Sequence, residues 1–267
     1  MKCLLKLIFF TCLQYSTCIN NIKNFNIKSM QFNLNKDSLW ISHPLKRTSF
    51  AELSKLIPET HKLTMCKIFE NDKPDYRLFY NFFEVRTPFF KGNRLEVVTL
   101  AKSTIDQTIS FIILDCFTNA MSWDPIDGIR ESNSKFQIKN TNSEYNIAIN
   151  SYKYKNNNEK YKDNNNQYKE NNEYKDDNEN DYIFNLKSLK STIQKNVLTD
   201  FSINPNRVCY FKNYPVGYKL IFNDNQIDKK VLLLKNVEFE TNIYNKYIKE
   251  LEHVFIYPQI MNFKVLF

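Results

Sequence analysis

Four charged residues in the first half of the chain have types and spacing that could bind an anion. Glu84 and Arg86 are two residues apart in one apolar stretch, and Arg94 and Glu96 are two apart in the next. Residues two apart in a β-strand lie on the same face of the sheet, so each pair shares a face. A hairpin turn at residues 91–93, where glycine accepts a positive φ, would place both pairs on the same side of the sheet.

Two interpretations of these four residues stay open. Inside a barrel, Arg86 and Arg94 could hold a carboxylate or phosphate, because a guanidinium donates paired hydrogen bonds to such groups, and Glu84 and Glu96 would orient them. On an outer face, the same residues would be solvated and would form cross-strand pairs worth about 0.2–1 kcal/mol each. Lys far outnumbers Arg in this chain, so arginine at two of the four positions favours a specific role.

Asp115 is a second candidate, because it follows the apolar run Ile109–Leu114, which predicts a buried strand. A carboxylate at the end of such a strand is a suitable general acid or base. The structural interpretation is that the segment simply leads into a turn, because Asp124 before Pro125 is common turn chemistry.

The motifs of several enzyme classes are missing from the sequence. It has no P-loop, GxGxxG, GxSxG or HExxH, and its 3 Gly cannot form a glycine-rich phosphate cradle. The 3 His lie far apart, at positions 43, 61 and 253, and no cysteines have zinc-ligand spacing. We therefore expect no metal and no cofactor, and leave open a disulfide among Cys66, Cys116 and Cys209.

The composition argues against a nucleic-acid partner in spite of the basic charge. The net charge is +8 and the pI is about 9.0, but Asn and Lys are the residues that an AT-rich genome encodes most easily. Tyr and Lys alternate in residues 151–181 as on a stacking surface for bases, yet acids in the same block cancel much of its charge. No later apolar run approaches the roughly 18 residues of a membrane span.

The N-terminus has the pattern of a targeting leader. Residues 1–18 combine Lys2, a short apolar run and a small-residue end, as secretory signal peptides do. Residues 19–45 are basic, have no acid before Asp37, and are expected to be disordered. A leader of this kind resembles the apicoplast-type precursors of apicomplexan parasites. The resemblance implies entry to the secretory pathway and a plastid lumen as destination; plain secretion is the alternative.

The remaining residues, 46–267, predict a single domain with an α+β fold that is mostly antiparallel β, with a curved or barrel-like sheet and one or two packed helices. A capped amphipathic helix is expected at Ser49–Ile57. An antiparallel meander is expected at Tyr76–Phe90, Arg94–Lys102 and Ile109–Asn119.

Residues 152–181 interrupt this domain. They are nearly all Asn, Lys, Asp, Glu and Tyr and predict a disordered insertion. The spacing of Ile243, Tyr247, Leu251 and Phe255 predicts one amphipathic helix, and the apolar end of the chain predicts a buried strand. Further strands are expected at Tyr182–Leu186, Val197–Ile203, Arg207–Phe211, Gly217–Phe222 and Lys230–Lys235.

One segment resembles a known family. LSKLIPE at Leu53–Glu59, followed by YNFFEVRTPFFKGNRLEVVTL at Tyr80–Leu100, is similar to the entry of acetoacetate-decarboxylase-like barrels, where a helix ending in proline precedes a strand and a hairpin. The resemblance covers Leu53–Leu100. It implies a barrel that holds a small or apolar carboxylate-bearing ligand. The family's Schiff-base lysine motif is not visible in the strands that follow, so decarboxylation is not implied.

Three functions stay open at this point. The first is a soluble, non-catalytic protein of an organelle lumen that binds a small amphipathic or carboxylate-bearing ligand, with Phe and Tyr around it and Arg86 or Arg94 as anchor. The second is an enzyme of unknown reaction that uses Glu84, Arg86 or Asp115. The third is a structural or partner-binding protein without a pocket, whose charged hairpin faces bulk water.

Overall fold

The structure is a computed structural model of the 267-residue chain. It describes residues 29–34, 37–86, 91–119, 135–141, 144–151, 182–197, 208–212, 218–222, 230–257 and 261–266. No helix within these ranges is long and apolar enough to cross a membrane.

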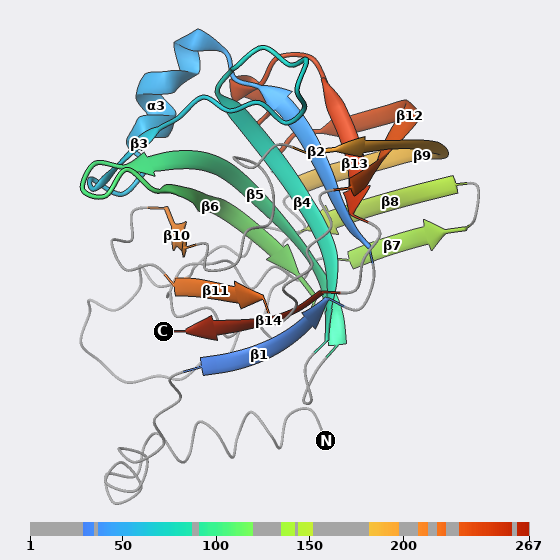
Figure 1. Ribbon diagram of the computed structural model, residues 1–267. Helices are drawn as coiled ribbons and strands as arrows, with labels where there is room; N and C mark the ends of the chain where they lie inside the picture. Colours follow the sequence, from blue (N-terminus) through green and yellow to red (C-terminus); the bar gives the residue numbers. More distant parts are fainter. Residues whose placement is uncertain are drawn as a thin grey trace, which may run out of the picture.

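Strands make up most of the described chain and join into one 14-stranded sheet (Figure 1). The helical parts are short: the α-helix α3 (Phe50–Ser54) and the 3-10 helices η1 (Arg47–Ser49) and η2 (Asn245–Tyr247). The strands are β1 (Ser29–Leu34), β2 (Ser38–Pro44), β3 (His61–Leu63), β4 (Arg77–Arg86), β5 (Lys91–Ser103), β6 (Ile109–Thr118), β7 (Lys135–Asn140), β8 (Glu144–Ser151), β9 (Tyr182–Asn196), β10 (Val208–Phe211), β11 (Tyr218–Phe222), β12 (Lys230–Thr241), β13 (His253–Tyr257) and β14 (Met261–Leu266).

Seven of the described strands close into a ring. The antiparallel meander β4–β5–β6 continues through a parallel pair, β6 with β10, and then through β11, β14 and β1. β1 pairs with the end of β4, where Leu34 lies opposite Val85, and this contact closes the ring. A sheet that closes on itself is a barrel, and closure removes the free edges.

A second part of the sheet, which we call the wing, extends from β4 through β2, β13, β12, β9, β8 and β7. Phe136 of β7 contacts Phe82 of β4, with ring centroids 6.1 Å apart. Phe184 of β9 contacts Tyr80 of β4 at 5.9 Å. The wing therefore curls back over one face of β4, as Figure 1 shows at β7, β8 and β9.

Apolar side chains form two cores, one on each face of β4. The outer core lies between β4–β6 and the wing, and the inner core lies on the opposite, concave face. Trp40 of β2 reaches Phe111 of β6, with ring centroids 5.7 Å apart, although β4 and β5 separate these strands in the sheet. Strong curvature of the sheet toward this face brings the two rings together.

The inner core consists of Trp40, Cys66, Ile68, Phe69, Phe79, Phe83, Val85, Val98, Leu100, Phe111, Ile113, Val197, Cys209, Val231, Phe255 and Tyr257. The outer core includes Leu39, Ile41, Leu78, Tyr80, Phe82, Leu95, Val97, Ile112, Leu114, Tyr145, Ile147, Phe184 and Leu186. The alternation along β4 between these two groups explains why its sequence is apolar on both faces.

The predicted fold class is confirmed. The sheet is mostly antiparallel, strongly curved and closed into a barrel, and α3 packs on it through Leu53. The predicted meander is confirmed as β4, β5 and β6. Cys66, Cys116 and Cys209 are buried, and no disulfide joins these three residues.

The prediction of disorder for residues 19–45 is wrong at Ser29–Leu34 and Ser38–Pro44, which form β1 and β2. β1 is paired on both sides, and β2 lies between β4 and β13 with Leu39, Trp40 and Ile41 buried. A strand that is buried on both faces lacks the alternation of polar and apolar residues that marks a half-exposed strand. The sequence pattern therefore did not predict β2, and the basic composition around it favoured disorder. Residues 1–28 lie outside the described ranges, so the signal peptide stays a prediction.

Two helix predictions are corrected as well. α3 has only five residues, Ser49 makes no side-chain capping bond, and Glu52 pairs with Lys246 at 2.9 Å. The expected helix through Ile243 and Phe255 is replaced by η2 and β13. Ile243 lies in the outer core and Phe255 in the inner core, so the apolar spacing records burial against two surfaces and not one helical face.

The predicted insertion at residues 152–181 lies outside the described ranges and stays a prediction. The strands on either side of it are direct neighbours in the wing, because Ser151 of β8 lies opposite Tyr182 of β9.

Candidate functional site

The β4–β5 hairpin places the four charged candidates on two opposite faces. Arg86 lies opposite Lys91 and Glu84 opposite Asn93, so residues 91–93 belong to β5 and do not form the turn. The expected turn at residues 91–93 is therefore wrong. A turn at residues 91–93 would pair even-numbered residues of β4 with even-numbered residues of β5. In the observed register, even-numbered residues of β4 lie opposite odd-numbered residues of β5. A shift by an odd number of residues exchanges the faces of a strand.

Glu84 and Arg86 lie on the side of β4 that faces the outer core, beyond Phe82. Glu84 forms an ion pair with Lys91, with Nζ and Oε1 3.4 Å apart. Arg86 is the last residue of β4 and is exposed. Glu84 is 11% exposed and Lys91 is 55% exposed, so the pair is a cross-strand contact with one solvated partner.

Arg94 and Glu96 lie on the inner face, because Phe83 of the inner core is the direct partner of Arg94. Nε of Arg94 lies 2.6 Å from Oε1 of Glu96, and both side chains are 12% exposed. Desolvation makes a pair shielded to this degree expensive, and apolar side chains of similar size often stabilise such positions equally well. Charge at this position therefore favours a role in binding over a role in stability.

Asn81 is a polar residue of the inner face that the sequence analysis did not single out. It lies opposite Glu96 of β5 and opposite Trp40 of β2. Its side-chain Oδ1 is shielded from solvent and accepts no hydrogen bond within the described part of the chain. A buried acceptor without a donor costs about 1–3 kcal/mol, so a ligand hydroxyl or N–H placed there would be stabilised.

Aromatic rings lie next to Asn81 on the inner face, because Trp40 is its partner on β2. Trp40 packs edge-on against Phe79 at 6.1 Å and contacts Phe111 at 5.7 Å. The indole N–H of Trp40 donates to the hydroxyl of Ser38 at 2.7 Å, so its polar atom is already engaged. The inner face thus combines one ion pair and an amide with an apolar aromatic wall, a combination suited to an amphipathic molecule.

Asp115 is separate from the Arg94–Glu96 pair. It lies opposite Val97, a residue of the outer core, next to an irregularity in the β5–β6 register. Its Oδ1 accepts the backbone N–H of Cys116 at 3.0 Å. Asp115 lies opposite Val97 of β5, and Val97 lies opposite Tyr80 of β4. Tyr80 is four residues before Glu84, which corresponds to about 13 Å along the strand. The Trp-Asp-Pro turn that follows in the sequence lies outside the described ranges.

A buried aromatic group around Tyr80 supports the outer face. The Tyr80 hydroxyl donates to the carbonyl of Ile243 at 2.6 Å, and burial raises the pKa of Tyr80. The His43 ring lies 5.9 Å from Tyr80 and 5.3 Å from Phe239, and burial lowers the pKa of His43. These contacts hold the wing against the barrel.

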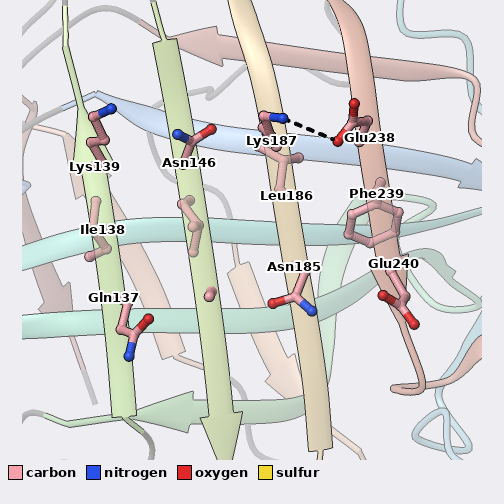
Figure 2. Close-up of a pocket in the computed structure, with 12 residues that line it drawn as sticks. Gln137, Ile138, Lys139, Asn146, Asn185, Leu186, Lys187, Glu238, Phe239 and Glu240 are labelled. Carbon is pink, nitrogen blue, oxygen red and sulfur yellow. Dashed lines mark ion pairs between the residues drawn. The ribbon is translucent and has the colours of Figure 1, made fainter.

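A shallow groove of about 660 Å³ crosses the outer surface of the wing (Figure 2). One wall is a row of side chains from four strands: Lys139, Asn146, Lys187 and Glu238. Figure 2 shows the Lys187–Glu238 ion pair of this wall, at 3.6 Å, and both side chains are largely exposed. Balanced and exposed charges of this kind are typical of a solvated sheet face, so the inner face is the better candidate site.

Comparison with known proteins finds no matching family model and no matching curated protein. Solved structures with a similar arrangement include acetoacetate decarboxylase from Legionella pneumophila, with 12% identity and a TM-score of 0.48 over 88% of this chain and 84% of that chain. An acetoacetate decarboxylase-like enzyme from Sphingomonas wittichii RW1 has 7% identity and a TM-score of 0.48 over 89% of this chain and 90% of that chain. The enduracididine biosynthesis enzyme MppR, complexed with pyruvate, has 4% identity and a TM-score of 0.46 over 88% and 87%.

Proposed function

We propose that the protein binds a small amphipathic ligand with a carboxylate group on the concave face of its barrel, without converting it chemically. The observation that supports this function best is the Arg94–Glu96 pair, a shielded charge pair beside an aromatic core. Arg94 donates to the ligand carboxylate, Glu96 fixes the guanidinium at Nε, and Asn81 accepts a hydrogen bond from the ligand.

The two other functions have less support. An enzyme that uses Glu84, Arg86 or Asp115 has less support, because Glu84 is paired with Lys91 and Asp115 accepts the backbone N–H of Cys116. The register also separates Glu84 from Asp115 by about 13 Å along the strand, so the two do not act on one substrate atom. The alternative without a pocket predicts that the charged hairpin faces bulk water, and Arg94 and Glu96 are instead each 12% exposed.

We further propose that residues 1–28 are a targeting leader that directs the protein through the secretory pathway to a plastid lumen. β1 begins at Ser29 and closes the barrel, so a cut downstream of Ser29 would remove a strand that the fold needs. A fluorescent reporter fused to residues 1–28 should reach the plastid. Secretion of the reporter into the medium would contradict the plastid proposal.

The test of the binding function is mass spectrometry of small molecules that co-purify with residues 29–267. Arg94→Met/Glu96→Leu removes both charges of the ion pair together, so that neither is left without the other. Arg86→Met is the matched control, because Arg86 is an exposed arginine on the opposite face of the same hairpin. We expect a carboxylate-bearing molecule on the wild type and on the control, and none on the double variant. Equal retention by all three proteins would contradict the proposed site.

A further inference from the structure

A histidine and two carboxylates from distant parts of the chain meet near the start of β4. Asp72 belongs to the segment between β3 and β4, and His253, 181 positions later, begins β13 next to Glu252. One ligand atom from each of the three side chains lies within 4.8 Å of the other two. The three groups are separate from Arg94 and Glu96, which lie toward the other end of β4.

The distances between these groups suit one small divalent cation. Nε2 of His253 lies 3.1 Å from Oδ1 of Asp72 and 3.7 Å from Oε1 of Glu252. Ligand atoms about 2.0–2.2 Å from a tetrahedral ion lie about 3.3–3.6 Å from one another. The two separations from His253 are close to that range, and the third separation, between Asp72 and Glu252, lies within 4.8 Å.

Other contacts hold the ligands in place. Oδ2 of Asp72 accepts the backbone N–H groups of Ile68 and Phe69 at 3.2 and 3.0 Å, while its Oδ1 is directed at His253. The Phe69 ring packs edge-on against the His253 ring at 5.0 Å. Contacts that orient a ligand group from behind are a regular feature of metal centres.

The charge of the cluster also suits a cation. Arg77, which is 2% exposed, binds both carboxylate oxygens of Glu252 through its two terminal nitrogens. With Asp72 and Glu252 ionised, Arg77 charged and His253 neutral, the formal charge is −1, and a divalent cation changes it to +1. The nearby guanidinium weakens the attraction, so reversible binding is expected and not a permanent structural ion.

We propose that Asp72, Glu252 and His253 bind a first-row divalent cation of the zinc class. One imidazole nitrogen with two carboxylate oxygens suits Zn²⁺, Mn²⁺ or Fe²⁺, whereas Ca²⁺ prefers oxygen ligands alone. The bound ion would join the segment before β4 to β13.

The experiment is a calorimetric titration of residues 29–267 with Zn²⁺, repeated with His253→Gln and Asp72→Asn. Glu238→Gln is the control, since Glu238 is an exposed carboxylate of the wing that pairs with Lys187. We expect one equivalent of Zn²⁺ on the wild type, at least tenfold weaker binding for both ligand variants, and a change of less than twofold for the control. Glu252→Gln should weaken binding less than Asp72→Asn, because Glu252 is shared with Arg77.

A second measurement does not depend on the folding of any variant. Co²⁺ added to the wild-type protein should give the visible d–d absorption of a four- or five-coordinate ion, and Zn²⁺ should displace it. A spectrum equal to that of hydrated Co²⁺ would overturn the proposal. Zn²⁺ binding of unchanged strength in a folded His253→Gln variant would overturn it as well.

Discussion

The ion pairs on the two faces of one hairpin differ in how many of their partners reach solvent. Glu84 is 11% exposed, but its partner Lys91 is 55% exposed, so solvent reaches one side of that pair. Arg94 and Glu96 are each 12% exposed, so removing one of them leaves the other charge poorly solvated.

We predict that Arg94→Met lowers the free energy of unfolding by about 2–4 kcal/mol, because Glu96 keeps its charge and loses its ion pair with Arg94. Arg86→Met should cost less than about 1 kcal/mol. Urea denaturation measures both. Losses below 1 kcal/mol for both variants would mean that the inner-face pair is solvated.

His43 gives the molecule a pH dependence. Its Nδ1 lies 3.1 Å from the carbonyl of Lys249 and therefore donates, while Nε2 is shielded and has no hydrogen-bond partner among the described residues. Burial lowers the pKa of His43 below its usual 6.5, so the folded state binds the proton less readily than the unfolded state does. Stability is therefore present above pH 6.5 and is lost as the pH falls below it.

We predict that the wild type loses stability between pH 7.5 and 5.5, with His43 contributing up to about 1.4 kcal/mol per pH unit. In His43→Asn, which keeps a donor near the Lys249 carbonyl, this slope should be smaller. Denaturation at the two pH values measures the difference. Equal slopes in the two proteins would assign the pH dependence to other groups, such as His61, whose pKa burial also lowers.

Among the elements, the β4–β5 hairpin shows which structural features the sequence pattern can predict and which it cannot. Alternating and aromatic residues predict β4, β5 and β6 and their antiparallel order, because these features are local. The register depends on which residues form the turn, and Gly92 gives a strong but misleading turn signal. An odd error in the turn position exchanges the faces, so the sequence could predict Arg94 and Glu96 as candidates but not their separation from Glu84 and Arg86.

The wing permits a test of the predicted insertion. Replacing residues 152–181 with Asn-Gly joins Ser151 to Tyr182, which are already opposite each other, through a two-residue hairpin turn. A shorter connection reduces the entropic cost of closing the loop. The free energy of unfolding should therefore be unchanged or higher by up to about 2 kcal/mol. A clear fall in the urea midpoint would mean that the segment contributes contacts to the fold.

A truncation tests whether the N-terminal strands β1 and β2 belong to the barrel. A protein that begins at residue 46 lacks β1, which closes the ring, and β2, which buries Leu39 and Ile41 in the outer core. It should not unfold cooperatively, whereas a protein that begins at residue 29 should. Thermal unfolding followed by circular dichroism compares them. A cooperative transition in the shorter protein would contradict the assignment of these strands to the barrel.

For the whole molecule, the contacts that define the barrel and the site are long-range. β6 pairs with β10 about 100 residues later, and β1 pairs with β14 at the other end of the chain. Composition and periodicity predict a curved, mostly antiparallel sheet but contain no information on such pairings. For the same reason the meeting of Asp72 with His253, and the shielding of Asn81, could not be foreseen from the residues themselves.

In the proposed function, the concave face recognises a carboxylate through Arg94. The most direct measurement compares the affinities of octanoic acid and 1-octanol, which differ mainly in the charged group, for residues 29–267. We predict that the wild type and Arg86→Met bind the acid at least tenfold more tightly than the alcohol, and that Arg94→Met/Glu96→Leu loses this preference. Equal affinity of the wild type for acid and alcohol, or an undiminished preference in the double variant, would contradict the claim.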